Sequence, residues 1–187
     1  MKDTKSKINS LPLIDISKFF KGSLKEKKEI ADRVAKACQQ VGFLLISGHG
    51  ISESQLNDLQ KRTLAFFDLA LEEKQKWCPI GPAKQRGYQR IETRNLASTI
   101  GELTPPDLRE TVFIGPIDDH RSHYAEMVDA QNAYAQNIIP TNPPGTKKAF
   151  IEAYRVFEKL SYSLMKILAL ALDLPENYFT ALIDKHF

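Results

Sequence analysis

The chain has 187 residues with 26 basic and 23 acidic side chains, and its formal net charge is +3. A surplus this small gives no reason to expect nucleic acid or an anionic membrane as a partner. No apolar run reaches the ~20 residues of a membrane span, and residues 1–10 lack the apolar stretch of a signal peptide. We therefore expect a cytoplasmic protein with a flexible N-terminus over residues 1–10. Cys38 and Cys78 fit no metal or redox spacing, which favours free thiols, and Cys38 is expected to face the core.

The first predicted elements are a short strand and an amphipathic helix. Residues 11–16 are rich in apolar side chains and read as the strand. Ser23 and Glu26 have the spacing of a capping box, and apolar residues then return every three or four positions until Gly42. This pattern predicts a helix that begins after Ser23, packs one face on a sheet and ends at Gly42.

A second strand, a tight turn and a second helix follow within a few residues. The four apolar residues 43–46 suit a fully buried strand, and His49, between two glycines, marks a tight turn. Ser52 and Gln55 again have capping-box spacing. We expect the helix that starts there to run unbroken towards Trp77.

The second half of the chain is predicted to contain one strand and one long helix. Residues 111–114 read as the strand, and residues 116–144 read as a polar loop with a helical turn around 124–134. Residues 146–172 carry a continuous apolar stripe at helical spacing. Pro175 suits the first turn of a last short helix.

Several motifs occur in an order that points to one protein family. They lie at residues 11–16 (LPLIDI), 42–51 (GFLLISGHGI), 66–74 (FFDLALEEK), 86–88 (RGY), 105–115 (PPDLRETVFIG) and 142–145 (NPPG). Together they resemble the isopenicillin N synthase-like family, the plant-type iron(II)/2-oxoglutarate-dependent dioxygenases. The resemblance covers residues 11–187, although Gly48 stands where relatives commonly have asparagine before the histidine.

The resemblance implies an α+β fold. The chain would be a non-haem dioxygenase N-terminal-type domain over residues 11–187, helical with a few short strands of an incomplete double-stranded β-helix, or jelly roll. The metal-binding jelly roll itself would be absent, so that the chain is truncated before it. In the complete enzyme, iron(II) and 2-oxoglutarate would support hydroxylation or desaturation of a small organic substrate, and this part would shape the substrate pocket.

The sequence contains neither cofactor signature of that family. Relatives hold iron with a His-x-Asp pair and a later histidine, a two-histidine, one-carboxylate set that leaves positions open. None of the 4 histidines is followed two residues later by Asp or Glu, and no arginine is followed at that spacing by the serine with which relatives bind 2-oxoglutarate. We therefore assign no catalytic and no metal-binding residue, expect no cofactor to bind this chain alone and expect no activity from it alone. Whether the chain acts as an enzyme stays open.

Arg86, Tyr88 and Arg90 are the candidate substrate-binding residues. In relatives the turn after the RGY motif approaches the mouth of the jelly roll, where a guanidinium can hold a carboxylate through two hydrogen bonds. A tyrosine there can add a ring face or a hydroxyl. The alternative is that Tyr88 packs in the core and both arginines are solvated.

The histidines allow a second set of interpretations. By the resemblance, His49 belongs to a structural turn, and a scaffold role is favoured over a catalytic one. His120 and His123 lie at helical spacing beside Asp118 and Asp119, which could bind a divalent ion. Coincidental clustering in a polar loop is the favoured interpretation.

Two further hypotheses remain open because the long apolar stripe of residues 146–172 needs a partner surface. The chain could be a stand-alone interaction module, or one half of a split oxygenase whose jelly-roll half is separately encoded. The expected partners are thus that half and, in the complete enzyme, a small-molecule substrate.

Overall fold

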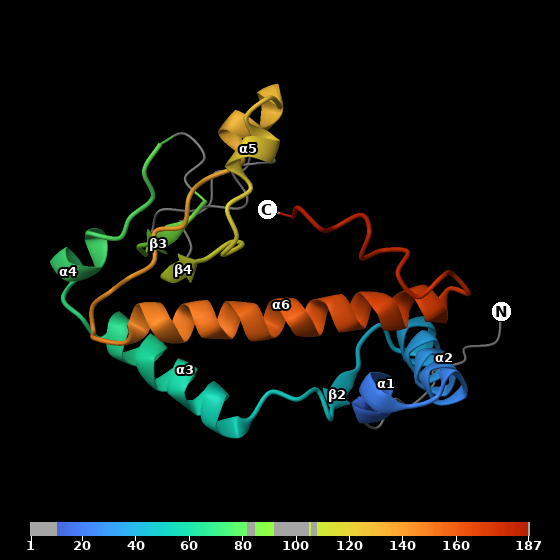
Figure 1. The fold of residues 1–187 in the computed structure, drawn as a ribbon. Helices are drawn as coiled ribbons and strands as arrows, with labels where there is room; N and C mark the ends of the chain where they lie inside the picture. Colours follow the sequence, from blue (N-terminus) through green and yellow to red (C-terminus); the bar gives the residue numbers. More distant parts are fainter. Residues whose placement is uncertain (1–10, 82–84, 92–104, 106–107, 187) are drawn as a thin grey trace. The chain divides into compact units, whose positions relative to one another are not determined.

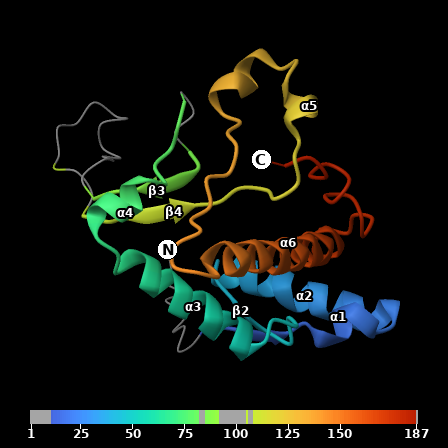
Figure 2. The same ribbon diagram turned by 60° about the vertical axis from the view of Figure 1, so that its left-hand side comes forward.

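The computed structural model describes residues 11–81, 85–91, 105 and 108–186, so the expected flexible N-terminus at residues 1–10 lies outside it. The chain divides into two compact units, one of residues 1–51 and 157–184 and the other of residues 52–156 and 185–187. In the part of the chain described here, no helix is long and apolar enough to cross a membrane. Figures 1 and 2 show the elements of each unit.

The first unit contains a two-stranded parallel sheet and the helices that cover one of its faces. Strand β1 (Leu13–Asp15) pairs with β2 (Leu45–Ser47), with Ile14 opposite Ile46. Between them the chain forms α1 (Ser17–Lys21) and α2 (Leu24–Gln40). The core gathers apolar side chains of β1, α1, α2 and the later part of α6 (Thr146–Ala171), namely Ile14, Ile16, Phe19, Ile30, Ala31, Val34, Ala37 and Ile167.

The other face of this sheet is open among the described residues. Leu13 and Leu45 are register partners, and they are 60% and 52% exposed. The prediction of a fully buried strand at residues 43–46 is therefore wrong for this structure. A run of apolar residues cannot tell a strand covered on both faces from one covered on a single face.

The local signals of α2 are confirmed. The Ser23 hydroxyl accepts from the backbone N–H of Glu26, and the Glu26 carboxylate accepts from the backbone N–H of Ser23, which is the predicted capping box. Gly42 follows the helix with φ +79°, a backbone conformation that glycine adopts without strain. Cys38, however, is exposed, so the prediction that it faces the core is wrong. It lies one residue past the buried face that ends at Ala37.

The second unit begins with two helices where the sequence predicted one. The predicted capping box of Ser52 and Gln55 starts α3 (Glu53–Phe67). The helix does not run on to Trp77, because Ala70 takes an extended conformation (ψ 148°) and α4 (Leu71–Gln75) begins after it. The prediction of an unbroken helix is thus wrong, although alanine favours helices.

An antiparallel pair of strands and the start of α6 complete the second unit. Strand β3 (Gly87–Gln89) runs antiparallel to β4 (Thr111–Phe113), and Figure 2 shows the two side by side. The expected strand and long helix are confirmed. The expected polar loop contains α5 (Arg121–Tyr124) and a 3₁₀ helix (Val128–Asn132). After Pro175 the chain forms turns instead of the expected helix.

Candidate functional site

Tyr88 is a core residue at the centre of β3. Its side chain is 1% exposed, and its ring meets the Phe66 ring edge to face at 5.8 Å. The phenol donates a hydrogen bond of 2.6 Å to Oε2 of Glu110. Tyr88 therefore joins α3 to the chain just before β4, and its hydroxyl already has a partner.

Glu110 also accepts from Lys74, a lysine that is only 8% exposed. The Lys74 ammonium lies 3.1 and 2.9 Å from the two carboxylate oxygens and donates a third bond of 2.9 Å to the carbonyl of Phe67. Three donors thus meet three acceptors in a mostly dry space, as a buried ammonium requires. Lys74, which lies in α4, is therefore hydrogen-bonded both to the last residue of α3 and to the residue that precedes β4.

The electrostatics of this cluster favour a charged Glu110 and a neutral Tyr88. Burial raises the pKa of Glu110, but the hydrogen bonds from Tyr88 and Lys74 and the charge of Lys74 outweigh it, so the pKa is lowered overall. Burial, and then the bond to Glu110, raises the pKa of Tyr88. The cluster is therefore a structural ion pair at neutral pH.

The side chain of Arg86 lies in a different environment from that of Tyr88. Its guanidinium lies flat against Gly115, where any side chain would overlap it. The Nε atom is buried and has no hydrogen-bond partner. Gly87, between Arg86 and Tyr88, has φ +102°, which takes the chain out of regular strand geometry. In a regular strand, Arg86 and Tyr88 would lie on the same face. The conformation of Gly87 explains why their side chains do not meet.

Arg86 lines a small polar pocket of about 230 Å³. We use the name polar pocket for the space lined by Arg86, residues 116–119, Arg121 and residues 134–137. Its wall is held by Asn137, whose amide accepts from the N–H of Gly115 at 2.7 Å and donates to the carbonyls of Gly115 and Pro116. The pocket is therefore built on a hydrogen-bonded frame.

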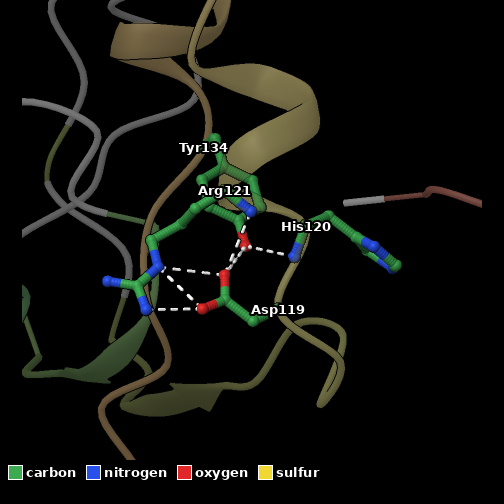
Figure 3. Close-up of polar contacts among 4 residues, drawn as sticks. All are labelled: Asp119, His120, Arg121 and Tyr134. Carbon is green, nitrogen blue, oxygen red and sulfur yellow. Dashed lines mark hydrogen bonds and ion pairs between the residues drawn. The ribbon is translucent and has the colours of Figure 1, made fainter.

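The acidic groups of the polar pocket are each neutralised by an arginine. Asp119 binds the Arg121 guanidinium at 2.8 and 3.0 Å and accepts from its backbone N–H, which lowers the pKa of Asp119 to about 2 (Figure 3). Tyr134 accepts from the backbone N–H of His120 beside this pair. Asp118 pairs with both terminal nitrogens of Arg155, one of them at 2.7 Å.

The three predicted substrate-binding residues therefore lie in three environments. Tyr88 is buried and bonded to Glu110, Arg86 lines the polar pocket, and Arg90 is exposed. Burial raises the pKa of the nearby Cys78 thiol, and the charge of Arg90 opposes this rise without cancelling it. The structure does not bring the three side chains together at one point.

The histidines take positions that fit scaffold roles. His49 accepts a hydrogen bond of 3.2 Å at Nδ1 from the backbone N–H of Ile51, which tightens the glycine-flanked turn. The His120 ring points away from the Asp119–Arg121 pair in Figure 3. Among the residues that the structure describes, no three His, Cys, Asp or Glu side chains lie close enough to hold a metal ion.

An apolar groove of about 290 Å³ lies elsewhere in the second unit, between α3, β4 and the start of α6. Its lining is mostly aliphatic and aromatic: Leu59, Thr63, Phe67, Val112, Ile114, Phe150, Ala153 and Tyr154. Sequence reasoning did not find this groove, the polar pocket or the Lys74–Glu110 pair. The signal for the pair was present, since Lys74 and Glu110 each lie in one of the motifs quoted above.

Comparison with known proteins gives consistent results. The family model described as non-haem dioxygenase in morphine synthesis N-terminal matches residues 11–142. Homoarginine-6-hydroxylase 2-ODD-C23 of Glycine max is 29% identical over 91% of this chain and 51% of the relative. A probable iron/ascorbate oxidoreductase of Dictyostelium discoideum is 30% identical over 95% of this chain and 50% of its own length.

Solved structures agree on the fold. The crystal structure of a full-length Neurospora crassa protein in complex with alpha-KG superposes with a TM-score of 0.73 at 24% identity, covering 93% of this chain and 50% of that one. A putative 2OG-Fe(II) oxygenase family protein from Caulobacter crescentus gives 0.66 at 19% identity, over 91% of this chain and 51% of that one. The chain thus spans about half the length of the relatives it matches. The family match over residues 11–142 shows that the chain belongs to the isopenicillin N synthase-like family of 2-oxoglutarate- and iron(II)-dependent dioxygenases.

Proposed function

We propose that this chain is the N-terminal, substrate-pocket-shaping part of an iron(II)/2-oxoglutarate-dependent oxygenase that hydroxylates or desaturates a small organic substrate. The observation that carries the proposal is the family match over residues 11–142 in a chain that spans about half of its relatives. The remaining half of the oxygenase would be a jelly roll on a separate or continuing polypeptide.

The residues of this chain do not fit an iron site. The sequence has no His-x-Asp or His-x-Glu pair. The described side chains also form no cluster of three possible ligands. A non-haem iron centre of this type needs two histidines and one carboxylate. In the proposal, iron and 2-oxoglutarate therefore belong to the other half, and no chemical step is assigned to residues of this chain.

The part that we assign to this chain is binding and shaping. Arg86 and Arg90 would offer guanidinium groups to the substrate, since Arg86 lines the polar pocket and Arg90 is an exposed residue. Tyr88 would contribute by holding β3 in place through Glu110, since its hydroxyl is already bonded. The named relatives include hydroxylases of homoarginine and a 1-aminocyclopropane-1-carboxylate oxidase, so the family alone does not fix the substrate.

A reconstitution experiment tests the proposal. The transcript is sequenced beyond the codon of Phe187, and the downstream open reading frame is produced as a separate polypeptide. We expect it to encode a His-x-Asp pair and a later histidine. We also expect succinate to form from 2-oxoglutarate only when both polypeptides are mixed with iron(II). Iron-dependent succinate formation by the 187-residue chain alone would contradict the proposal, and so would a downstream sequence without these ligands.

One observation favours a second candidate, a stand-alone interaction module. Leu13 and Leu45 form an exposed apolar pair on the open face of the β1–β2 sheet. Exposed apolar surface of this kind often marks a protein contact. The two candidates differ in one result, because a module would bind its partner without any gain of oxygenase activity.

A further inference from the structure

We propose that the apolar groove of the second unit binds a small, neutral, planar aromatic molecule. The groove lies between α3, β4 and the start of α6, and its volume is about 290 Å³. None of the three candidate substrate-binding residues lines it. The inference therefore goes beyond the proposed function, and it needs neither iron nor a second polypeptide.

The lining of the groove on α3 and β4 follows from the regular geometry of these elements. Leu59, Thr63 and Phe67 are four positions apart, so they share one face of α3. Val112 of β4 and Ile114, one residue beyond its end, alternate and so point to one side of the strand. Two elements thus turn mostly apolar side chains towards one space.

Ala153 leaves room on the side of α6. Phe150, Ala153 and Tyr154 are three and four positions apart on one face of that helix. Because the alanine contributes only a methyl group beside two aromatic side chains, a larger side chain at 153 would project into the groove. Ala153 is partly exposed, so the space there is open to a ligand from solvent.

Two polar contacts hold the walls of the groove in place. The Arg62 guanidinium donates a hydrogen bond of 2.8 Å to the carbonyl of Pro144, just before α6, and so ties α3 to that helix. The Lys74 ammonium bonds both the carbonyl of Phe67 and the carboxylate of Glu110, which ties the end of α3 to the residue before β4. A site whose walls are already ordered loses less entropy when a ligand binds.

Charge and hydrogen bonding select the class of ligand. None of the described residues that line the groove is charged, so a carboxylate or an ammonium would lose its water there without gaining a partner. The lining offers two hydroxyls. That of Tyr154 already bonds the His186 ring at 3.2 Å, whereas that of Thr63 has no partner among the described residues. Thr63 can therefore exchange one hydrogen bond with a neutral ligand.

The volume of the groove suits two fused rings. An apolar cavity of about 150 Å³ binds benzene, and the groove has close to twice that space. Phe67 and Phe150 offer aromatic rings against which a planar ligand can pack edge to face or offset. 2-Naphthol has two fused rings, one hydroxyl and no charge at neutral pH, so it is the probe that matches the groove.

The test is a titration of the methyl-labelled 187-residue chain with 2-naphthol at neutral pH, followed by ¹H–¹³C methyl spectra. We expect saturable shifts at the methyl groups of Leu59, Val112 and Ile114, and none at Ile14 in the core of the other unit. 2-Naphthoate carries a carboxylate on the same rings and should bind at least tenfold more weakly. Shifts that do not saturate, or equal affinity for the two compounds, would overturn the proposal.

Variants test the space and the hydroxyl separately. Ala153→Phe fills the groove and should weaken 2-naphthol binding at least tenfold. Thr63→Val removes the hydroxyl at nearly constant shape and should weaken binding about two- to tenfold, whereas Thr63→Ser should bind nearly as tightly as the original chain. The matched control is Ala125→Phe, at an exposed position of the same unit outside the groove, and it should change the affinity less than twofold.

Thermal melts establish which variants are folded. Unchanged affinity in folded Ala153→Phe would refute the site. If Ala153→Phe does not fold, the conservative pair at position 63 decides in its place, because equal affinity in Thr63→Val and Thr63→Ser would refute the hydrogen bond that places the ligand.

A protein segment as the occupant of the groove gives different results. We expect sedimentation to show a monomer with and without 2-naphthol. A dimer that Ala153→Phe dissociates would mean that a second copy of the chain fills the groove, and would overturn the proposal. Loss of 2-naphthol binding when the downstream polypeptide is added would overturn it as well. Absence of 2-naphthol binding leaves the reconstitution experiment untouched, and a failed reconstitution with saturable binding would refute the oxygenase role alone.

Discussion

Replacing Lys74 with methionine should be among the most damaging single changes in the second unit. The Lys74 side chain is 11% exposed and Glu110 is 23% exposed, so the variant leaves a carboxylate largely out of water with one partner, Tyr88, instead of two. It also leaves the carbonyl of Phe67 without the bond that Lys74 donates. Removing one member of a buried pair costs about 3–5 kcal/mol, and the partial exposure of Glu110 reduces this to about 2–4 kcal/mol.

The chain offers a closely matched control two residues away. Lys76 pairs with Glu73, but the two side chains are 59% and 42% exposed. Exposed pairs contribute about 0–1 kcal/mol, so Lys76→Met should change the free energy of unfolding by less than about 0.5 kcal/mol. Both variants remove a lysine charge from the same helical segment, and burial is what distinguishes them.

The free energy of unfolding of both variants is measured by urea denaturation, with the fluorescence of Trp77, the single tryptophan, as the signal. The carbonyl of Trp77 accepts from the backbone N–H of Tyr88 in β3, so the fluorescent residue lies next to the cluster that the Lys74 variant changes. Equal losses for Lys74→Met and Lys76→Met would refute the argument from burial. A loss below about 1 kcal/mol for Lys74→Met would show that Glu110 is solvated, with its ion pair worth no more than a surface pair.

Three further predictions follow from local geometry. Ser52→Ala removes the α3 cap and should cost about 1 kcal/mol, whereas Ser161→Ala on the exposed side of α6 should cost a few tenths at most, as urea denaturation would show. Gly87→Ala should cost more than Gly81→Ala, because both glycines have positive φ but only a side chain at 87 would overlap the Trp77 carbonyl; equal melting temperatures would contradict this. Asp119 and Glu26 have pKa values lowered to about 2, from 3.8 and 4.5, so their stabilising effect is complete above pH 4.5 and is lost as the pH falls towards 2; a melting temperature constant over that range would contradict the assignment.

Signals that act within a few residues were predictable from the sequence. Both capping boxes formed as the spacing of Ser23 with Glu26 and of Ser52 with Gln55 predicts. The long helix at α6 likewise follows from its continuous apolar stripe. These features depend on hydrogen bonds and periodicity inside one element, so no knowledge of the rest of the chain is needed.

Features that depend on distant partners were not predictable in the same way. Lys74 and Glu110 are separated by 36 residues, and although each lies in one of the family motifs, neither motif indicates which residue the other side chain pairs with. The Lys74 ammonium also donates to the carbonyl of Phe67, the last residue of α3, so the same side chain contacts the end of that helix. The prediction that residues 43–46 are fully buried was wrong for a related reason. The exposure of Leu45 depends on which faces of the sheet are covered by other elements.

The candidate site shows how one motif can divide its tasks between neighbouring residues. In RGY, the glycine takes a positive φ that separates the directions of the residues on either side. Tyr88 then anchors the strand through Glu110 and Lys74, and Arg86 rests on Gly115 at the wall of the polar pocket. The buried Tyr88–Glu110–Lys74 cluster and the wall of the polar pocket therefore meet at one three-residue motif, and the positive φ of its glycine is what sends the two neighbouring side chains to different places.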